Sequence, residues 1–359
     1  MSRHLDGGSS AAQRAVAAAA PLLAAAVAER VTPGAVLQVA GPLGPGTTAA
    51  VGATAYGGAA VTPATVYDLA SLTKVTACLP SFLVLLEAGE VRLTDTVDRF
   101  FSNAGWMQEP SLGGVTLEEL ALHRSGLEAW RPLYATVQGR RTVLANVLQS
   151  AVTPARGRNV YSDLGVIVLT AVIERVAGER IDAFAARHVF EPLGMTATRY
   201  GPLPDGAAVA ATEDDGLRGP LVGRVHDENA DAMEGVSGHA GLFGTAADLT
   251  RYAQAWLRLE APFASADHMR LATSDLSGGE GVRRGVLWRL AEPDWPFGPG
   301  FSGGAYGHTG FTGTSMVIEP AAGLVIVLLT NRVHPHRGNA VGIAALRRAV
   351  HGAVREAFA

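Results

Sequence analysis

The chain has 359 residues, of which 48% are hydrophobic and 17% are charged, and its formal net charge is −4. This composition indicates a compact soluble protein with a full-sized core, and the length allows about two domains. The sequence contains no long basic tract, so nucleic acid is not an expected partner. The single cysteine, Cys78, excludes an internal disulfide framework and a cysteine-rich metal site.

The basic residues are almost all of one kind. Lysine and arginine together number 29, and only Lys74 is a lysine. A guanidinium stays charged in proteins, whereas a desolvated amine can lose its proton near neutral pH. The single lysine therefore indicates a position that needs an amine able to lose its proton, which arginine cannot supply.

The N-terminal residues predict one helix followed by two strands. An alanine-rich stretch at 15–28 predicts an amphipathic helix that packs on a sheet, and strands are expected at 35–41 and 48–57. Two arginines precede the stretch, as in a secretory signal, but Pro21 interrupts it. We expect no cleaved signal and a cytoplasmic location; the alternative is export with residues 1–28 as the signal peptide. No other segment is apolar for the ~20 residues that a membrane span needs, so no integral membrane segment is expected.

The middle of the chain reads mainly as helices. Thr116-Leu117-Glu118-Glu119 is a capping box, which predicts a helix through Leu122. Apolar residues recur at helical spacing from Tyr161 to Ala177 and end at Gly178. Further helices are expected at 71–86, 182–190 and 246–259.

The C-terminal part returns to strands. Strands are expected at 286–290, 314–318 and 324–329, a loop at 293–304, and a last helix at 341–358. This order predicts one antiparallel sheet built from both termini, flanked by helices, with an inserted all-α region. The predicted domains are an α/β sheet domain (1–65 plus 280–359) and a mostly helical domain (66–279), with the active site in the cleft between them.

Ser71 and Lys74 lie at the start of a helix that is expected to kink at Pro80. Residues three apart share a helix face, so the hydroxyl and the amine can meet. A serine hydroxyl needs a neighbouring base to become a nucleophile, and the free N–H groups of a first helical turn stabilise negative charge. The alternative is a helix-capping serine followed by a surface lysine.

Tyr161-Ser162-Asp163 stands at the mouth of another expected helix. A tyrosine beside a lysine can act as a proton shuttle, because nearby positive charge favours its phenolate. Asp163 can hydrogen-bond the lysine and a substrate amide. The alternative is a core tyrosine with a helix-start aspartate.

A glycine-rich run precedes a strand: Gly307-His308-Thr309-Gly310-Phe311-Thr312-Gly313-Thr314. Its glycines let a substrate lie against the strand edge. The N–H after Gly310 can pair with that of Ser71 as an oxyanion hole, and His308 can donate a hydrogen bond or charge to the substrate or the tyrosine. The alternative is a hairpin with an incidental histidine.

In this order and spacing, the three motifs resemble the penicillin-recognising serine hydrolases, which include class C β-lactamases, D-Ala-D-Ala carboxypeptidases and family VIII esterases. The look is closest to penicillin-binding-protein-4B-like proteins. Other segments that resemble the family are Leu122-His123-Arg124-Ser125-Gly126-Leu127, Phe190-Glu191-Pro192-Leu193-Gly194-Met195, Gly238-His239-Ala240-Gly241-Leu242-Phe243 and Leu329-Thr330-Asn331-Arg332-Val333-His334-Pro335.

The resemblance implies a β-lactamase-like α/β (α+β) fold and an acyl-enzyme formed on Ser71. Lys74 and Tyr161 would handle the proton, and the family leaves open which is the base. The N–H groups of Ser71 and Phe311 would form the oxyanion hole. The expected substrate-binding residues are Asp163, His308, Thr309, Gly310 and Phe311, together with Arg337, which can bind a carboxylate bidentately as Arg332 can.

Two positions depart from the commonest family pattern. Asp163 replaces an asparagine, so its charge should favour a protonated Lys74 and shift the base role toward Tyr161. His308 replaces the lysine of most β-lactamases, which makes efficient β-lactamase activity the less favoured assignment.

Several other features have a structural interpretation. The cluster at 224–229 looks metal-like, but adjacent residues point in different directions, which favours a solvated or loop-anchoring role. Cys78 reads as a small core residue, and Trp288 and Trp295 either line the cleft or pack.

The expected function is a serine hydrolase acting on a D-amino-acid amide or a carboxylic ester, with weak or no β-lactamase activity. The alternatives are an efficient class C-type β-lactamase and a catalytically silent penicillin-binding or sensor module. We expect no cofactor and no metal, a small-molecule or peptide substrate, and β-lactams as inhibitors. The sequence does not specify the oligomeric state.

Overall fold

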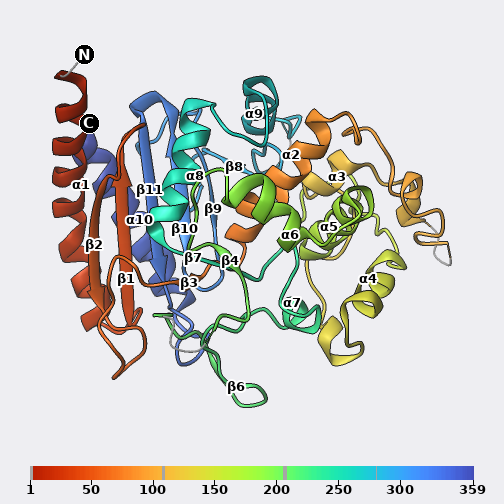
Figure 1. Cartoon of the computed structure of the whole chain (residues 1–359), viewed down its shortest axis with the longest axis horizontal. Helices are drawn as coiled ribbons and strands as arrows, with labels where there is room; N and C mark the ends of the chain where they lie inside the picture. Colours follow the sequence, from red (N-terminus) through yellow and green to blue (C-terminus); the bar gives the residue numbers. More distant parts are fainter. Residues whose placement is uncertain (1–2, 107–109, 205–207, 280) are drawn as a thin grey trace.

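The computed structural model describes residues 3–106, 110–204, 208–279 and 281–359 (Figure 1). Its main sheet is antiparallel and has six strands in the order β2-β1-β11-β10-β9-β8. Both ends of the chain supply these strands, as the sequence predicts. Their bounds are β1 Gly34–Ala40, β2 Thr47–Gly52, β8 Arg289–Leu290, β9 Tyr306–Thr309, β10 Ser315–Glu319 and β11 Leu324–Thr330.

Helices cover both faces of this sheet (Figure 1). The terminal helices α1 (Arg3–Ala28) and α10 (Ala340–Phe358) pack against each other and on the sheet, and α8 (Ala246–Arg258) packs on β1, β10 and β11. Because both faces are covered, every residue of β1 and β11 is buried, which explains their unbroken apolar runs.

A second body of mostly helical chain lies beside the sheet (Figure 1). Its centre is α5 (Asp163–Ala177), in which every residue from Leu164 to Ile173 is buried. The other helices are η1 Lys74–Cys78, α2 Leu79–Glu87, η2 Val97–Arg99, η3 Leu112–Gly114, α3 Leu117–Ala121, η4 Leu133–Ala135, α4 Arg140–Leu148, α6 Ile181–Ala185, η5 Ala186–Phe190, α7 Glu228–Ala232, α9 Ala266–Thr273 and, at the sheet, η6 Pro320–Ala322. The short strands are β3 Tyr67–Asp68, β4 Arg199–Tyr200, β5 Asp214–Asp215, β6 Gly219–Pro220 and β7 Leu242–Gly244.

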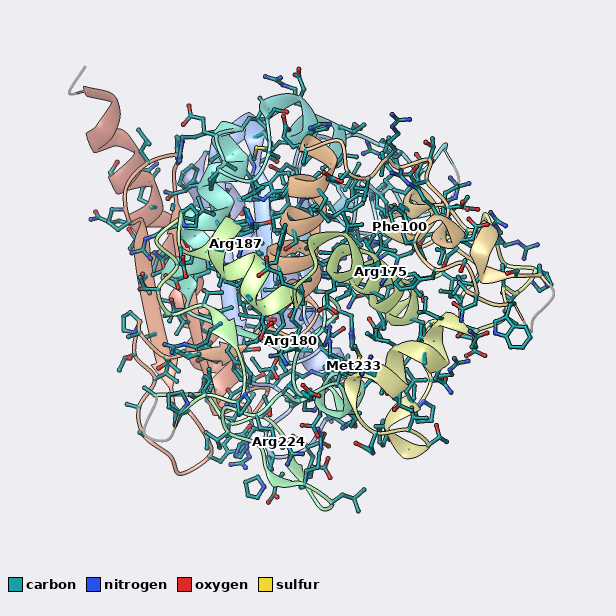
Figure 2. All side chains as sticks on the ribbon, turned by 45° about the vertical axis from the view of Figure 1, so that its right-hand side comes forward. Phe100, Arg175, Arg180, Arg187, Arg224 and Met233 are labelled. Atoms are coloured by element: carbon teal, nitrogen blue, oxygen red, sulfur yellow. The ribbon has the colours of Figure 1, made fainter. Side chains whose placement is uncertain are left out.

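The outer side of this helical body carries exposed arginines, among which Arg180 and Arg187 have carboxylate partners. Arg175, Arg180 and Arg187 are exposed there (Figure 2). Arg180 forms an ion pair with Asp182, and Arg187 forms one with Glu179. Exposed ion pairs of this kind contribute little to the free energy of folding, so we assign these arginines no role beyond covering the helical body with charged side chains.

The predicted fold class is confirmed, and most predicted elements are present within a few residues. The capping box at Thr116 has both of its hydrogen bonds, and Gly178 ends α5 with a left-handed backbone. The helix after Ser71 differs, because it opens with the π-helix η1 and Pro80 lies at the start of α2. The predicted strand at 286–290 was too long: Leu287 has a φ of 59°, which an extended strand does not allow, so only β8 remains.

The N-terminal helix is part of the packed core, as predicted. Side chains along one face of α1, including Ala15, Ala19 and Leu23, are fully buried in the cluster that also holds Leu37 and Leu328. Within the described ranges, Ser10–Ala28 is the one stretch long and apolar enough to cross a membrane. The predicted domain boundaries stay predictions; α8, from the segment assigned to the helical domain, lies on the sheet.

Candidate active site

Ser71 follows a turn that is held in an unusual backbone conformation. Ala70 has a φ of 47°, a left-handed value that costs free energy for a residue with a side chain. Asp68, the last residue of β3, fixes the turn: its two carboxylate oxygens accept hydrogen bonds from the N–H of Ala70 (2.8 Å) and of His226 (2.7 Å). The turn therefore presents Ser71 in one orientation.

The end of β9 packs directly on this turn. A Cβ atom at Gly310 would lie 2.6 Å from the Leu69 carbonyl oxygen and 2.1 Å from Thr314 Oγ1, so only glycine fits. The hydroxyls of Thr312 and Thr314 donate hydrogen bonds to the carbonyls of Asp68 (2.8 Å) and Leu69 (3.1 Å). These contacts join the glycine-rich run to the segment that carries Ser71.

Two backbone N–H groups remain free beside the serine. Among the described residues, neither the N–H of Ser71 nor that of Phe311 has a protein acceptor, whereas the N–H of Gly310 donates to Thr314. Ser71 and Phe311 both line the same two cavities. This is the arrangement that an oxyanion hole requires.

Lys74 is completely buried, and three acceptors surround its amine. Nζ lies 3.0 Å from Ser71 Oγ, 2.9 Å from the His239 carbonyl oxygen and 2.7 Å from Asp163 Oδ1. Burial alone would lower the pKa of Lys74, but the Asp163 carboxylate and the Tyr161 hydroxyl together outweigh it and raise the pKa above its ordinary value. Lys74 is therefore an ammonium at neutral pH, as the sequence predicts for an aspartate at position 163.

Tyr161 stands over Lys74, and its ring centre is 5.1 Å from Nζ. Burial raises the pKa of the Tyr161 phenol, and the charge of Lys74 and hydrogen bonding to Lys74 and Ser71 offset this only in part. The His123 ring packs against the Tyr161 ring at 4.6 Å between centroids. Its Nδ1 accepts a hydrogen bond from the N–H of Ser162 (3.0 Å), which fixes the segment that carries the tyrosine.

His308 lies on β9 with its ring 6.0 Å from that of Tyr161. Its Nδ1 is 2.9 Å from the Thr309 carbonyl, which can only accept, so Nδ1 carries the proton and Nε2 carries a lone pair. Burial and the charges of Lys74 and Arg284 lower the pKa of His308 to about 3. His308 is thus neutral, and both roles predicted for it are wrong for this state: it has no charge to supply, and its Nε2 can accept a hydrogen bond from the substrate or the tyrosine but cannot donate one.

Ser71 lies in the lining of two cavities. One of about 520 Å³ is lined by Ser71, Tyr161, His308, Thr309 and Arg284, among others. The other, of about 360 Å³, is lined by Ser71, Tyr161, Asp163, Asp227 and Glu228, among others. The edge of β9 at His308 and Thr309 extends past β8, which pairs only with Tyr306 and Gly307. An extended substrate can therefore lie along this edge.

Arg337 lies at the rim of the second cavity. Its guanidinium is bound by the carboxylates of Glu213 and Glu228, the latter at 2.7 Å. Arg332 donates to the backbone carbonyls of Phe311, Arg337 and Gly338. Both guanidinium groups are thus occupied, and the predicted role of Arg337 in binding substrate stays a prediction.

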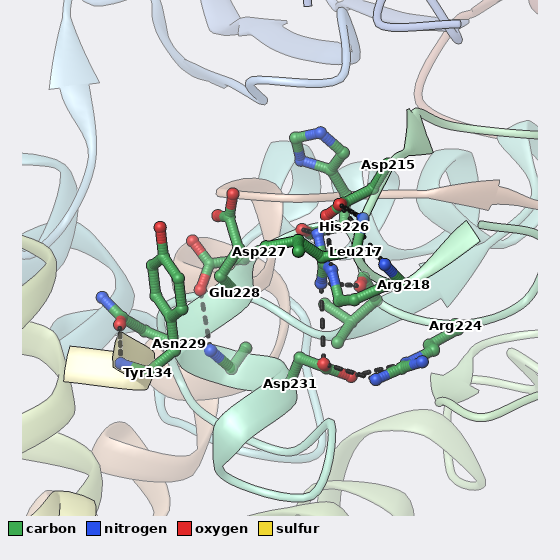
Figure 3. A network of polar contacts seen from close by, with 12 residues as sticks. Tyr134, Asp215, Leu217, Arg218, Arg224, His226, Asp227, Glu228, Asn229 and Asp231 are labelled. Carbon is green, nitrogen blue, oxygen red and sulfur yellow. Dashed lines mark hydrogen bonds and ion pairs between the residues drawn. The ribbon is translucent and has the colours of Figure 1, made fainter. Parts of the chain in front are cut away.

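The cluster at 224–229 anchors loops, and its side chains point to different partners (Figure 3). Arg224 pairs with Asp231, His226 Nε2 lies 2.9 Å from Glu213, and Asp227 caps α7 and contacts His239 at 2.9 Å. No group of three or more potential metal-binding side chains occurs within the described part of the chain.

Three other predicted features lie in the core. Cys78 is buried, and burial raises its pKa to about 12, so it is not a reactive thiol. Trp288 and Trp295 are also buried; they pack in the core and do not line the cavities beside Ser71.

Sequence reasoning missed two residues that shape the site. His123 belongs to one of the family-like segments, but nothing local indicates that its ring supports Tyr161. Arg284 lines the larger cavity at 5.7 Å from the Tyr161 ring centre, and it is 5% exposed. It is one of many arginines, so its sequence context carries no signal.

Comparisons with known proteins agree with this geometry. The family model described as Beta-lactamase matches residues 19–351. The chain is 31% identical to the "N-acetylmuramyl-L-alanine amidase" of Bacillus subtilis (strain 168) over 75% of this chain and 68% of that protein. It is 30% identical to the "Putative D-alanyl-D-alanine carboxypeptidase" of Escherichia coli O157:H7, over 76% of this chain and 70% of that protein.

Solved structures show the same fold at low identity. Simvastatin synthase from Aspergillus terreus aligns with a TM-score of 0.75 and 18% identity, over 96% of this chain and 98% of that chain. A β-lactamase from Sulfitobacter sp. EE-36 aligns with a TM-score of 0.73 and 21% identity, over 96% and 98% of the two chains. With the serine, lysine and tyrosine brought together as the motifs predict, this chain belongs to the β-lactamase family of penicillin-recognising serine hydrolases.

Proposed function

We propose that the protein hydrolyses an amide bond next to a D-amino acid, in the manner of a DD-carboxypeptidase, through an acyl-enzyme on Ser71. The observation that carries this proposal is the contact of Ser71 Oγ with Lys74 Nζ at 3.0 Å beside two free backbone N–H groups. Two of the curated relatives are named as an amidase and as a putative D-alanyl-D-alanine carboxypeptidase, and both names describe cleavage of an amide bond. Carboxylic esters need the same attack and offer a better leaving group, so they are expected to be cleaved as well.

In the proposed reaction, Ser71 attacks the carbonyl carbon, and the N–H groups of Ser71 and Phe311 stabilise the oxyanion. Lys74 donates a hydrogen bond to Ser71 Oγ in the free protein and is held protonated by Asp163, so it does not take the serine proton in this state. The ionised fraction of Tyr161 is then the acceptor: its phenolate takes the serine proton, and the resulting phenol returns this proton to the leaving nitrogen. Water hydrolyses the ester on Ser71 in a second step.

We infer that β-lactamase activity is weak. The neutral His308 stands where most β-lactamases have a lysine, and the protonated Lys74 leaves few groups able to activate the second water. An acyl-enzyme formed from penicillin should therefore persist. β-Lactams would act as inhibitors, with no metal or cofactor required.

The location of the protein also stays a proposal. The burial of Ala15, Ala19 and Leu23 against the sheet supports a helix α1 that is retained and not cleaved as a signal. A cytoplasmic protein follows if no other export route applies. Intact-mass measurement of the protein from its native host tests this, because cleavage after residue 28 would contradict it.

Labelling with a fluorescent penicillin, followed by mass spectrometry of the modified peptide, tests the acyl-enzyme. We expect a long-lived adduct on Ser71, hydrolysis of p-nitrophenyl esters, and loss of both in Ser71→Ala. A long-lived adduct without any hydrolysis would instead support a silent penicillin-binding module. Rapid turnover of penicillin would support a class C-type β-lactamase. No adduct and no ester hydrolysis would contradict the enzyme.

A further inference from the structure

The segment 237–239 supplies one of the three acceptors that surround the Lys74 amine. The carbonyl oxygen of His239 accepts a hydrogen bond from Lys74 Nζ at 2.9 Å. The other two acceptors, on Ser71 and Asp163, belong to other segments of the chain. A backbone carbonyl can orient a buried ammonium only when the segment that carries it is held in one position. Whatever holds this segment therefore also controls the direction of the amine.

The imidazole ring of His239 has a polar partner at each of its two nitrogens. Its Nδ1 lies 2.7 Å from Ser237 Oγ, and its Nε2 lies 2.9 Å from Asp227 Oδ1. Burial alone would raise the pKa of Asp227, but the contacts with His239 and with the N–H of Ala230 outweigh it and lower this pKa. An ionised carboxylate can only accept, so Nε2 carries a proton and donates it to Asp227.

A serine, a histidine and an aspartate in contact are also the side chains of a catalytic triad, but these three do not form a second hydrolytic centre. Ser237 is 0% exposed and His239 is 1% exposed, and neither lines the cavities beside Ser71. A nucleophile needs space for a carbonyl carbon next to its oxygen. The contacts of the His239 ring therefore hold the backbone and do not serve a reaction of their own.

The neighbouring Gly238 packs the same segment against two helices of the site. Its N–H donates a hydrogen bond to Thr170 Oγ1 on α5 at 3.0 Å. A Cβ atom at Gly238 would collide with this Oγ1 and would lie 2.9 Å from Cys78 Sγ on η1. Since α5 begins with Asp163 and η1 begins with Lys74, the segment is fixed relative to both members of the ion pair.

We propose that His239 and Asp227 are positioning residues, whose side-chain contact fixes the carbonyl oxygen that orients the Lys74 amine toward Ser71. The proposal rests on the function proposed above and adds two residues to its machinery. Without this contact the carbonyl can move, and one N–H of the ammonium loses its acceptor. Because Lys74 is fully buried, water does not replace that acceptor, and Nζ would shift from its 3.0 Å contact with Ser71 Oγ.

The single lysine of the chain allows a direct measurement on its amine. Protein labelled with a heavy nitrogen isotope only at lysine Nζ gives one side-chain NMR signal, that of Lys74. Exchange of its N–H protons with water reports whether the acceptors are in place. In His239→Leu, which lacks both ring nitrogens, we expect this exchange to be faster by about 10-fold or more, the effect of one hydrogen bond to a charged group.

Hydrolysis of p-nitrophenyl esters is measured on the same variants. In His239→Leu, kcat should fall by about 10- to 100-fold, because a misdirected amine no longer assists Ser71. KM should stay within about threefold, because His239 does not line the cavities beside Ser71. His239→Gln places an amide donor close to the position of Nε2, so it should recover most of the kcat and of the protection from exchange.

His351→Leu is the matched control. His351 is 0% exposed and also contacts a serine, Ser315 at 3.3 Å, but it lies on α10 and stacks on Phe297. This variant should lower the free energy of unfolding, as His239→Leu does, and should leave kcat and the lysine signal as in the wild type. An equal change of the lysine signal in both variants, or unchanged exchange and kcat in His239→Leu, would overturn the positioning role.

Two variants of Asp227 decide the question if His239→Leu does not fold. The side chain of Asp227 is 22% exposed, and its hydrogen bonds from His239 Nε2 and the N–H of Ala230 both go to Oδ1. Asp227→Ala removes this oxygen, whereas Asp227→Asn keeps an oxygen in its place without the charge. We expect exchange of the lysine protons to be at least about threefold faster in Asp227→Ala than in Asp227→Asn. Equal exchange in the two variants would contradict the proposal.

The two readouts separate this proposal from the function on which it rests. Failure of the wild type to hydrolyse any ester or D-amino-acid amide would count against the proposed function. The exchange of the Lys74 protons would still decide whether His239 and Asp227 hold the amine, because it is measured without a substrate.

Discussion

The side chains of Lys74 and Asp163 form an ion pair next to the nucleophile, with Nζ 2.7 Å from Oδ1. Lys74 is fully buried, and Asp163 is 18% exposed. Because the carboxylate stabilises the ammonium and disfavours the phenolate of Tyr161, it raises the pKa of both groups. One residue thus controls the protonation of both candidates for the general base.

This relationship predicts the pH dependence of Asp163→Asn. The base must be deprotonated to act, so kcat/KM of the wild type should rise with pH through the neutral range. Removing the carboxylate lowers the pKa of Lys74 and of Tyr161, so the rising limb should move to lower pH whichever of the two is the base. The measurement is the pH profile of p-nitrophenyl ester hydrolysis. Asp267→Asn, at an exposed position, is the control. If the rising limb of Asp163→Asn stayed in place or moved to higher pH, Asp163 would not control the protonation of the base.

Lys74→Arg should be almost inactive. Three acceptors within 3.0 Å surround the amine in a site without solvent exposure, which leaves no room for a planar guanidinium, and arginine cannot exchange a proton. We expect a loss of about 10³-fold in kcat/KM, in the range of a lost general acid–base group. Arg175→Lys, on the exposed face of α5, is the matched control. Full activity of Lys74→Arg would show that the single lysine of this chain has no catalytic meaning.

The parts of the site that the sequence predicts are those held by local geometry. Ser71 and Lys74 are three residues apart in one helical segment, and Asp163 begins a helix whose apolar spacing is plain. Long-range packing decides the rest. The neutral state of His308 follows from its burial beside Lys74 and Arg284, and burial of a single polar residue cannot be read from its neighbours in sequence.

Long-range packing also explains why the sequence did not predict the place of Arg284 or the end of the strand expected at 286–290. The apolar run there has the pattern of a strand, yet the left-handed backbone of Leu287 ends it, because the chain must turn to bury Trp288 among Trp256 and Tyr306. The turn places Arg284 in the cavity wall. No periodicity within the segment encodes that contact.

Gly310→Ala should damage the oxyanion hole. The added Cβ would lie 2.6 Å from the Leu69 carbonyl oxygen and 2.1 Å from Thr314 Oγ1, so the loop must move away from the turn that carries Ser71. We expect a loss of about 10²- to 10³-fold in kcat, as for removal of one oxyanion donor, and a fall of about 1–3 kcal/mol in the free energy of unfolding from overpacking. Ester hydrolysis and urea unfolding measure the two effects. Gly303→Ala is the control, because a Cβ at Gly303 would meet nothing within 4 Å. If the two variants were equally active, the close packing at Gly310 would not be needed for catalysis.

Leu23→Ala tests whether α1 belongs to the folded protein. The Leu23 side chain is fully buried in the cluster formed by α1, α10 and the sheet, far along the chain from Ser71. Truncating a buried leucine leaves a cavity, so the free energy of unfolding should fall by about 2–4 kcal/mol, while kcat/KM per folded molecule should stay the same. Urea unfolding at equilibrium measures the change, and Ala24→Ser, on the exposed face of the same helix, should alter it by less than about 0.5 kcal/mol. If Leu23→Ala were as stable as the wild type, α1 would contribute nothing to the fold, and its role as a removable leader would become the better explanation of its composition.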